Sequence, residues 1–422
     1  MQKKIIEILN YNNLNSEFCS KHFPELFNRP DKMSYDLKMI FKAWQRQNLI
    51  TEKYKSGEII NLSHGDPVQS QLSKNFKKTL KKILSTNTLH KYPSSAGNEQ
   101  TKVVLSHYIN NRYLKNKLIT GSNIIIGNST TYLFNLLCQN LLRPFDVVII
   151  PSPTYGIFAY IPERYGASIK FLDLKQEDNW FVNINELKKA ILHINNKLNT
   201  LAKQKKLCYI PRVSMLFLIN PSNPIGNYYS TKNYDDLEAI AETCIKNNIV
   251  IVEDLLYDGT IYDNKKIVSV LNTKAFPDNA VILQGISKAY GLASLRAGFA
   301  ISNEIIINCL RNKLFQNMDS ASLLQSKALE GVFGTPLTTL IKIENKNSNI
   351  YEYNLNLIIA MINGIDSIDT KSFNKLIIKD INKVTKNKKF TKKLLNGIEG
   401  ISILKNSLPQ SGFFINLNFQ NI

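Results

Sequence analysis

Lys288 and Arg296 lie eight residues apart in the stretch SKAYGLASLRAG (287–298), directly after a short apolar run. Burying a positive charge is costly unless the charge is paired or neutralised. A lysine at the rim of a buried sheet becomes a nucleophile when its pKa is depressed, and the fork-shaped guanidinium of arginine suits a phosphate. The stretch therefore predicts a site for an anionic or electrophilic ligand.

Two earlier stretches could bind a flat, phosphorylated ligand. Ser129 and Thr130, in GNSTTYLFNLL (127–137), are cap-type residues in front of a helix. The free amides of a helix start favour a phosphate, although an ordinary N-cap is the alternative. Tyr155, in PSPTYGIF (151–158), follows a proline-stiffened turn. Its ring could stack on a flat ligand, and a core tyrosine is the alternative.

Two later stretches add hydrogen-bonding and charged groups. Asn223 lies in NPSNPIG (220–226), where two Asn-Pro steps and a glycine indicate a tight turn that exposes its amide. Asp254 and Tyr257, in EDLLYDG (253–259), are three residues apart, so a single helical turn would place them on one side. An aspartate at the end of a buried strand needs a cationic or protonated partner, unless it caps a helix.

Each of these stretches follows an apolar run that predicts a strand. Several runs are apolar throughout, which is typical of strands covered on both faces. They recur at 124–127, 146–150, 168–172, 214–219, 249–253, 280–284 and 297–301. Helical patterns between many of them, such as 130–142 and 233–247, predict an α/β fold with a mainly parallel seven-stranded sheet sandwiched by helices. Ligands bind such sheets beyond the carboxyl ends of the strands, where the polar residues above lie.

The pattern along the chain predicts three parts. Residues 1–60 read as a helical extension with amphipathic spacing at 34–49, and residues 61–305 as the large domain. Residues 306–422 read as a smaller α+β domain, because longer helical stretches take over there and short strands return at 400–419.

Composition narrows the function classes. The net charge of +20 suggests nucleic acid, but only eight of the 53 basic residues are arginine, in a chain rich in asparagine and isoleucine. Residues encoded by AT-rich codons are enriched together, which points to genome composition as much as to a partner, and we expect no nucleic-acid partner. The lysine runs at 202–206 and 382–393 read as solvated helix faces.

We expect a soluble, cytoplasmic protein without a membrane partner. The longest apolar runs, such as 147–150 and 215–219, are too short to span a bilayer, and the N-terminus lacks the apolar segment of a secretory signal. The five cysteines show neither metal-ligand nor redox spacing, which indicates a reducing compartment and no metal site.

Together the motifs describe one ligand, pyridoxal 5′-phosphate (PLP), which binds through a Schiff-base lysine and an acidic partner of its ring nitrogen. The chain resembles the class I/II aminotransferases of the aspartate aminotransferase fold, fold type I of the PLP-dependent enzymes. The matches run in order from about residue 61 to 418: LSHGDP (62–67), YPSSAGNEQTKVVLSHYI (92–109), GNSTTYLFNLL, PTYGIF, NPSNPIG, DLLY, SKAYGLASLRAG and LPQSGFFINL (408–417).

The resemblance implies a role for each matching residue. Lys288 would form the Schiff base with PLP and carry the proton between the substrate α-carbon and C4′ of the cofactor. Asp254 would keep the pyridine nitrogen protonated, while Tyr257 and Asn223 would bind the ring oxygen O3′. The other cofactor ligands would be Tyr155 against the ring and, around the phosphate, Ser129, Thr130, Arg296 and the neighbouring Ser287.

The resemblance also implies a homodimer with shared active sites, because Tyr92 matches a tyrosine that reaches the phosphate of the neighbouring subunit. Gly65 matches a backbone that approaches the substrate carboxylate. Two positions depart from the family. Gly285 replaces a phosphate-binding serine, a loss of roughly 1 kcal/mol or more. No arginine follows Arg311 to pair with the substrate carboxylate, so we expect a C-terminally short small domain.

The expected function is amino-group transfer between an amino acid and a 2-oxo acid. A PLP-dependent lyase or synthase on the same scaffold, such as a C–S lyase, an aminocyclopropane-carboxylate synthase or a cyclising enzyme, is one alternative. A non-catalytic protein that keeps the fold is another, favoured by the missing arginine and opposed by the complete set of ring-binding residues. The substrate and the role of the lysine-rich segment 190–212 do not follow from the sequence.

Overall fold

The computed structural model describes residues 81–334, except for 82, 86, 91, 115–117 and 262–265, and in the C-terminal part 386, 401–403, 410–411 and 417–419. The predicted extension 1–60 with its helix at 34–49, Gly65 and most of the lysine run at 382–393 lie outside the described residues. The domain boundaries near residues 60 and 305 stay predictions.

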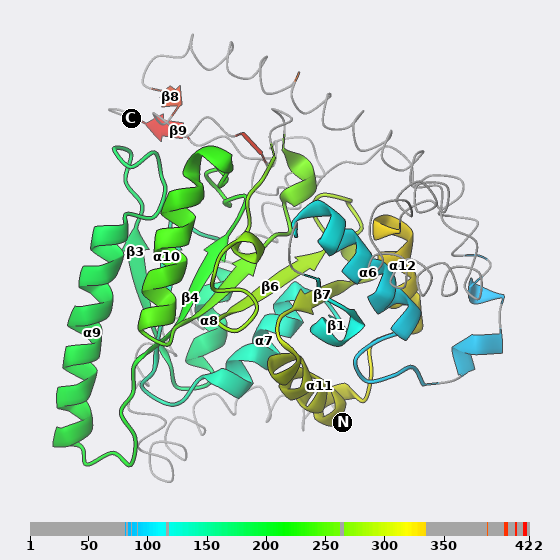
Figure 1. Ribbon diagram of the computed structural model, residues 1–422, viewed down its shortest axis with the longest axis horizontal. Helices are drawn as coiled ribbons and strands as arrows, with labels where there is room; N and C mark the ends of the chain where they lie inside the picture. The colour runs from blue at the N-terminus through cyan, green and yellow to red at the C-terminus, as the bar shows by residue number, and fades with distance from the viewer. Residues whose placement is uncertain are drawn as a thin grey trace, which may run out of the picture. The chain divides into compact units, whose positions relative to one another are not determined.

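Seven strands form one sheet in the order β1-β7-β6-β5-β4-β2-β3 (Figure 1). The pairs within β2 to β6 are parallel, and only β7 runs antiparallel to its two neighbours, β1 and β6. This confirms the predicted mainly parallel sheet, and every strand overlaps a predicted run. The strands are β1 Ile124–Gly127, β2 Val147–Ser152, β3 Ser168–Asp173, β4 Val213–Ile219, β5 Val250–Asp254, β6 Ala280–Gly285 and β7 Gly298–Ile301.

Helices cover both faces of the sheet. One face packs on α7 (Thr130–Leu141), α8 (Ile157–Glu163) and α11 (Glu304–Met318). The other face packs on α6 (Glu99–Arg112), α9 (Ile184–Gln204), α10 (Tyr234–Lys246) and α12 (Leu323–Phe333). Short 3-10 helices connect these elements: η1 Asn87–His90, η2 Gly121–Asn123, η3 Thr231–Asn233, η4 Asp258–Thr260, η5 Val270–Asn272 and η6 Ala293–Leu295.

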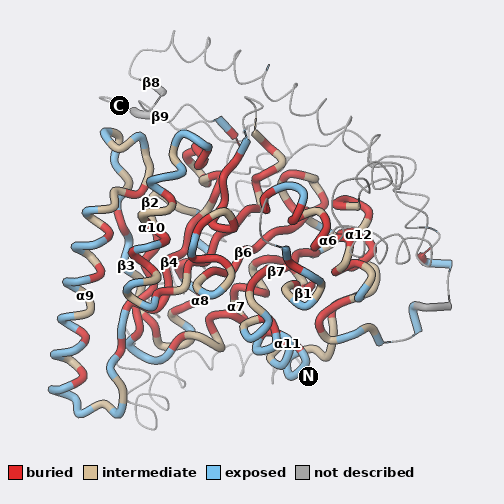
Figure 2. The backbone as a smooth tube through the Cα atoms, viewed as in Figure 1, coloured by how far each residue is buried: buried red, intermediate tan, exposed pale blue. Residues whose placement is uncertain are grey.

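The central strands are largely apolar because successive side chains enter different cores. The edge strand β3 differs, since Lys170 and Phe171 are exposed. Ile124 and Ile126 of β1 pack toward α6, whereas Ile125 between them packs toward α7. All three are fully buried, and Figure 2 shows the same burial along the central strands. The period-two pattern of a half-exposed strand is therefore absent from these segments.

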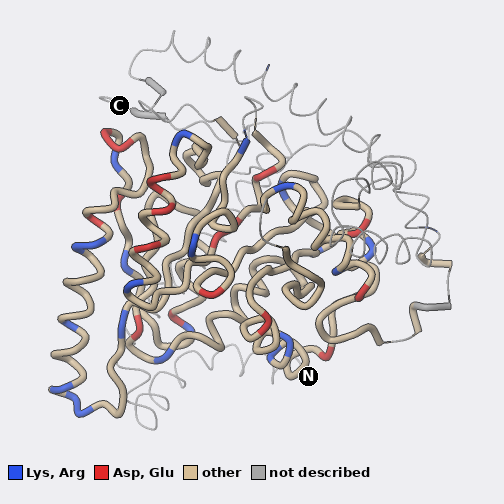
Figure 3. Tube along the Cα trace, viewed as in Figure 1, with Lys and Arg blue, Asp and Glu red and all other residues tan. Residues whose placement is uncertain are grey.

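The C-terminal part contributes a short antiparallel pair, β8 (Ile401–Ile403) with β9 (Leu417–Phe419), where the sequence predicts returning strands. The predicted lysine run at 202–206 lies at the end of α9, and Lys203, Lys205 and Lys206 are exposed. Figure 3 shows basic residues at the end of this helix. This confirms a solvated face. Within the described ranges, no helix combines the length and apolar character that crossing a membrane requires.

Candidate active site

The strand registers bring the predicted site residues to one edge of the sheet. Asp254 ends β5 and is paired with Ile219 of β4 on one side and Leu283 of β6 on the other. Gly298, at the start of the antiparallel β7, pairs with Gly127 at the end of β1 and with Gly285 at the end of β6. The carboxyl ends of β1, β4, β5 and β6 therefore share this edge with the amino end of β7.

The start of α7 lies at this edge and carries two predicted phosphate ligands. Ser129 caps the helix and its Oγ accepts a hydrogen bond from the Tyr132 amide at 3.3 Å. Its φ of 104° belongs to the left-handed region, where a non-glycine residue is unusual and is often found at a functional turn. Ser129 and Thr130 are both buried. Arg296, also left-handed, comes two residues before Gly298, is exposed, and donates from Nη1 to the Ala293 carbonyl at 3.3 Å.

Gly298 lets β7 approach the start of α7. A Cβ at this position would lie 2.7 Å from the Thr130 amide nitrogen and 3.0 Å from the Ser129 carbonyl carbon, both backbone atoms. Gly298→Ala is therefore expected to push the helix start away from β7. Since overpacking typically costs about 1–3 kcal/mol, unfolding in denaturant should show a loss of that size.

Gly156→Ala is the matched control, because a Cβ there would meet no atom within 4 Å. Its φ of −60° is also one that alanine adopts freely. If both alanine variants unfold at the wild-type denaturant concentration, the close approach of β7 to α7 is wrong.

Backbone atoms of Ala297 and Gly298 leave no room for a side chain at Gly285. A Cβ there would lie 2.8 Å from the Ala297 carbonyl oxygen and 3.2 Å from Gly298 Cα. A serine at this position would therefore require the backbones of β6 and β7 to separate. In this chain the two strand ends therefore pack too closely for the serine that the resemblance to the family implies at this position.

Asp254 is 2% exposed, and its Oδ1 accepts a hydrogen bond from the Leu256 amide at 2.9 Å. Burial raises the pKa of this carboxyl to about 7, and the Leu256 amide only partly opposes the shift. The ion pairs among the described residues do not include Asp254. The carboxyl therefore suits a ligand that brings a protonated nitrogen to it.

Asn223, after β4, and Tyr257, after β5, are in contact. Asn223 Nδ2 donates to Tyr257 Oη at 3.1 Å, and both residues are buried. The peptide bonds before Pro221 and Pro224 are cis, and Gly226 has a φ of 81°, so the predicted tight turn is present. Two polar side chains predicted to bind one ring oxygen are thus in contact.

Lys288 follows β6 in a turn that is stabilised by two of its own backbone hydrogen bonds. The Gly291 amide donates to the Lys288 carbonyl at 3.1 Å, and the Leu292 amide donates to the Ile286 carbonyl at 3.0 Å. Ser287 is buried and Lys288 is half-buried. The turn thus presents Lys288 from the strand next to Asp254.

The two predicted aromatic ligands are more exposed. Tyr155 follows β2, is 48% exposed, and meets Phe158 edge-on at 5.9 Å between ring centroids. Tyr92 is 85% exposed. The segment after it runs beside β1, where the Ile126 amide donates to the Ala96 carbonyl at 3.0 Å. Neither ring is buried in a core, which was the alternative for Tyr155.

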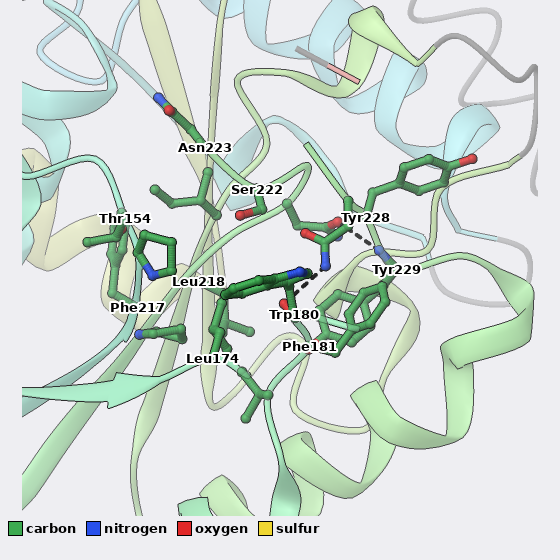
Figure 4. A pocket seen from close by; sticks show the side chains of 16 residues that line it. Thr154, Leu174, Trp180, Phe181, Phe217, Leu218, Ser222, Asn223, Tyr228 and Tyr229 are labelled. Atoms are coloured by element: carbon green, nitrogen blue, oxygen red, sulfur yellow. Dashed lines mark hydrogen bonds between the residues drawn. The ribbon is translucent and has the colours of Figure 1, made fainter. Parts of the chain in front are cut away.

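A shallow hollow borders the turn that carries Asn223. Figure 4 shows Thr154 and Asn223 on one side, with Trp180 and Phe181 across from them. None of the residues that line it is Asp, Glu, Lys or Arg. The hollow adds uncharged and mostly apolar surface beside the candidate cofactor site.

The structure also adds a buried carboxyl that the sequence analysis missed. Glu253 is fully buried and accepts hydrogen bonds from Asn220 Nδ2 at 2.7 Å, from the Val270 amide at 2.9 Å and from Ser269 Oγ. Asn220 Oδ1 in turn accepts from the Tyr229 amide at 3.1 Å. This network anchors the start of the asparagine turn, and an acidic residue inside an apolar strand was its only signal in the sequence.

Comparison with known proteins agrees with this geometry. A family model described as aminotransferase class I and II matches residues 57–411. The chain belongs to the class I and II aminotransferases. Enzymes of this family are PLP-dependent, so this aminotransferase requires that cofactor. The buried Asp254, the Asn223–Tyr257 pair and the start of α7 fit its ring nitrogen, ring oxygen and phosphate.

The named relatives of this aminotransferase are distant. It is 23% identical to the asparagine–oxo-acid transaminase of Streptococcus mutans over 307 residues, which are 71% of this chain and 72% of that protein. It is 24% identical to an LL-diaminopimelate aminotransferase of Dehalococcoides mccartyi over 320 residues, 75% of each chain. The solved alanine aminotransferase of Pyrococcus furiosus superposes with a TM-score of 0.66 at 20% identity, covering 88% of this chain and 79% of that one.

Proposed function

We propose that this aminotransferase binds PLP through Lys288 and transfers an amino group between an amino acid and a 2-oxo acid at the sheet edge described above. When bound, PLP withdraws electrons from the substrate α-carbon and so makes its proton acidic. The buried Asp254 carries the proposal, because a carboxyl without a charged partner among the described residues suits a protonated ring nitrogen.

The remaining side chains would bind PLP and orient its ring. Asn223 and Tyr257 hydrogen-bond the ring oxygen, and Tyr155 covers one face of the ring. Ser129 and Thr130 at the start of α7, with Arg296 and Ser287, bind the phosphate, since a helix start and a guanidinium both favour an anion. Lys288 would hold the cofactor through Nζ, and the same amine would move the proton between the substrate α-carbon and C4′ of the cofactor.

We also propose that the enzyme is a homodimer in which Tyr92 reaches the phosphate of the neighbouring subunit. Its 85% exposure and its position before the segment that pairs with β1 support this role. Gly65, which lies outside the described residues, is proposed to approach the substrate carboxylate.

Product analysis with and without a 2-oxo acid tests the reaction. An aminotransferase needs the acceptor for sustained turnover, and each oxo-acid product is matched by one new amino acid. Sustained release of ammonia or of a side-chain fragment without an acceptor would contradict transfer and would favour a lyase.

A further inference from the structure

An ion pair with a buried carboxylate lies at the turn of Tyr257, and the proposed function gives it no role. Asp258 is 2% exposed and follows Tyr257 directly, at the start of η4. Arg112, at the end of α6, donates to both of its carboxylate oxygens, from Nε at 2.8 Å and from Nη2 at 2.6 Å. Such a two-point contact fixes orientation as well as distance.

Two tyrosines, one in α6 and one at its C-cap, also contact Asp258. Tyr113 Oη donates to Asp258 Oδ2 at 2.5 Å, and Tyr108 Oη donates to the same oxygen at 3.3 Å. Burial raises the pKa of both phenols well above its usual value, and the Asp258 carboxylate adds to each shift. Both hydroxyls therefore keep their protons and donate.

Asp258, Arg112, Tyr108 and Tyr113, here called the Asp258 cluster, stabilise the turn that carries Tyr257. The Asp258 amide donates to the Leu255 carbonyl at 3.0 Å, and Thr260 donates to the Tyr257 carbonyl from its amide at 2.9 Å and from Oγ1 at 2.7 Å. Within this single turn, Tyr257 points to Asn223 while Asp258 points to α6. Fixing the Asp258 carboxylate therefore fixes the backbone from which Tyr257 projects.

Residues on either side of Lys288 in the sequence contact Asp258 or η4. Gln284, four residues before the lysine, donates from Nε2 to Asp258 Oδ2 at 3.5 Å. After the lysine, Ala289 packs so closely on η4 that a Cβ at Gly259 would lie 2.9 Å from Ala289 Cβ. The next residue, Tyr290, stacks edge-on against Phe333 of α12 at 5.2 Å between ring centroids.

We propose that Asp258 and Arg112 form a positioning pair that sets the spacing between Tyr257 and Lys288 by tying η4 and the Lys288 turn to α6. This inference rests on the proposed function, because it assigns the pair to the binding of the same cofactor. Neither residue touches the reacting atoms.

The test uses the full chain loaded with PLP and compares Asp258→Asn with Arg112→Lys. Three quantities are measured: the rate of cofactor dissociation, the pH midpoint of the visible band of the bound cofactor, and the melting temperature. Displacing Tyr257 weakens a hydrogen bond that favours the anionic ring oxygen, so the pH midpoint should rise. Dissociation should accelerate about tenfold, which corresponds to about 1.4 kcal/mol.

Asp146→Asn is the matched control. Asp146 is 4% exposed and accepts from the Arg143 amide at 3.0 Å and the Arg212 amide at 3.1 Å. It lies just before β2, at the opposite edge of the sheet. Its replacement should lower the melting temperature and leave the pH midpoint and the dissociation rate unchanged.

A merely structural pair would lower the melting temperature while both cofactor measurements stay at the wild-type values, and that result would overturn the inference. If Asp258→Asn does not fold, Arg112→Lys decides by the same criteria, because it keeps a positive charge at a side chain that is 39% exposed. A wild-type protein that shows no cofactor band would overturn the proposed function itself.

Discussion

Lys288→Ala is expected to abolish covalent attachment of PLP and to lower the rate of amino transfer by at least about 10²–10⁴-fold, the usual contribution of a positioned acid–base group. Nζ of Lys288 would be lost both as the attachment point and as the group that moves the substrate proton. The fold should survive, because Lys288 is half-buried and backbone hydrogen bonds, from the Gly291 amide to the Lys288 carbonyl and from the Leu292 amide to the Ile286 carbonyl, hold its turn.

Borohydride reduction followed by peptide mass analysis checks the attachment. The reduced cofactor should appear on the peptide that contains Lys288 in the wild type and on no peptide of the variant. Lys274→Ala is the control, since Lys274 is 70% exposed in surface ion pairs with Glu238 and Glu242. Label on another lysine, or wild-type turnover by Lys288→Ala, would contradict the proposed role.

Asp254→Asn is expected to lower activity while it stabilises the apoprotein at neutral and alkaline pH. An opposite charge at contact distance shifts a pKa by about 1–3 units, so the ring nitrogen should lose that much proton affinity in the variant. Turnover, which depends on the protonated ring, should fall roughly 10- to 1,000-fold at pH 8.

The free energy of unfolding of the apoprotein should rise in the Asp254→Asn variant at neutral and alkaline pH, although its activity falls. Burial raises the pKa of Asp254 from 3.8 to about 7 in the folded chain, so the folded state holds a proton that the unfolded state releases. Wild-type stability therefore falls as pH rises through the window from about 4 to about 7. Glu253, whose pKa burial also raises to about 7, adds to the same slope.

Asparagine at position 254 does not titrate, so the contribution of Asp254 to the pH dependence of the free energy of unfolding is lost. Denaturant unfolding of the apoproteins at pH 5 and pH 8 should show a smaller pH dependence for the variant, with a gain on the order of a few kcal/mol at most at pH 8. Asp173→Asn is the control, because Asp173 ends β3 at the same edge but is exposed. A variant with the wild-type slope would show that Asp254 is ionised in the folded apoprotein.

Much of the fold could be predicted because it depends on local patterns. Runs such as 124–127 and 280–284 are apolar throughout, and each became a strand within two residues of its predicted bounds. The rule that ligands bind beyond parallel strand ends then placed Asp254 and Lys288 together. The antiparallel direction of β7 was not predicted, since a four-residue apolar strand carries no signal of its direction.

The supporting shell could not be predicted for a different reason. Arg112 and Asp258 are 146 residues apart, and Asn220 and Glu253 are 33 apart, with no shared motif to connect them. Gly285 was interpreted only as a lost hydroxyl, because the approach of the Ala297 carbonyl depends on how two strands pack. Such contacts follow from tertiary packing, which composition and spacing do not encode.

The visible absorption of the purified, PLP-loaded protein during titration with amino acids tests the central claim most directly. We expect a visible band that shifts when a suitable amino acid is added and returns when a 2-oxo acid follows, and no shift of this kind in Lys288→Ala. A protein without a cofactor band, or a band that behaves identically in Lys288→Ala, would contradict amino transfer through Lys288.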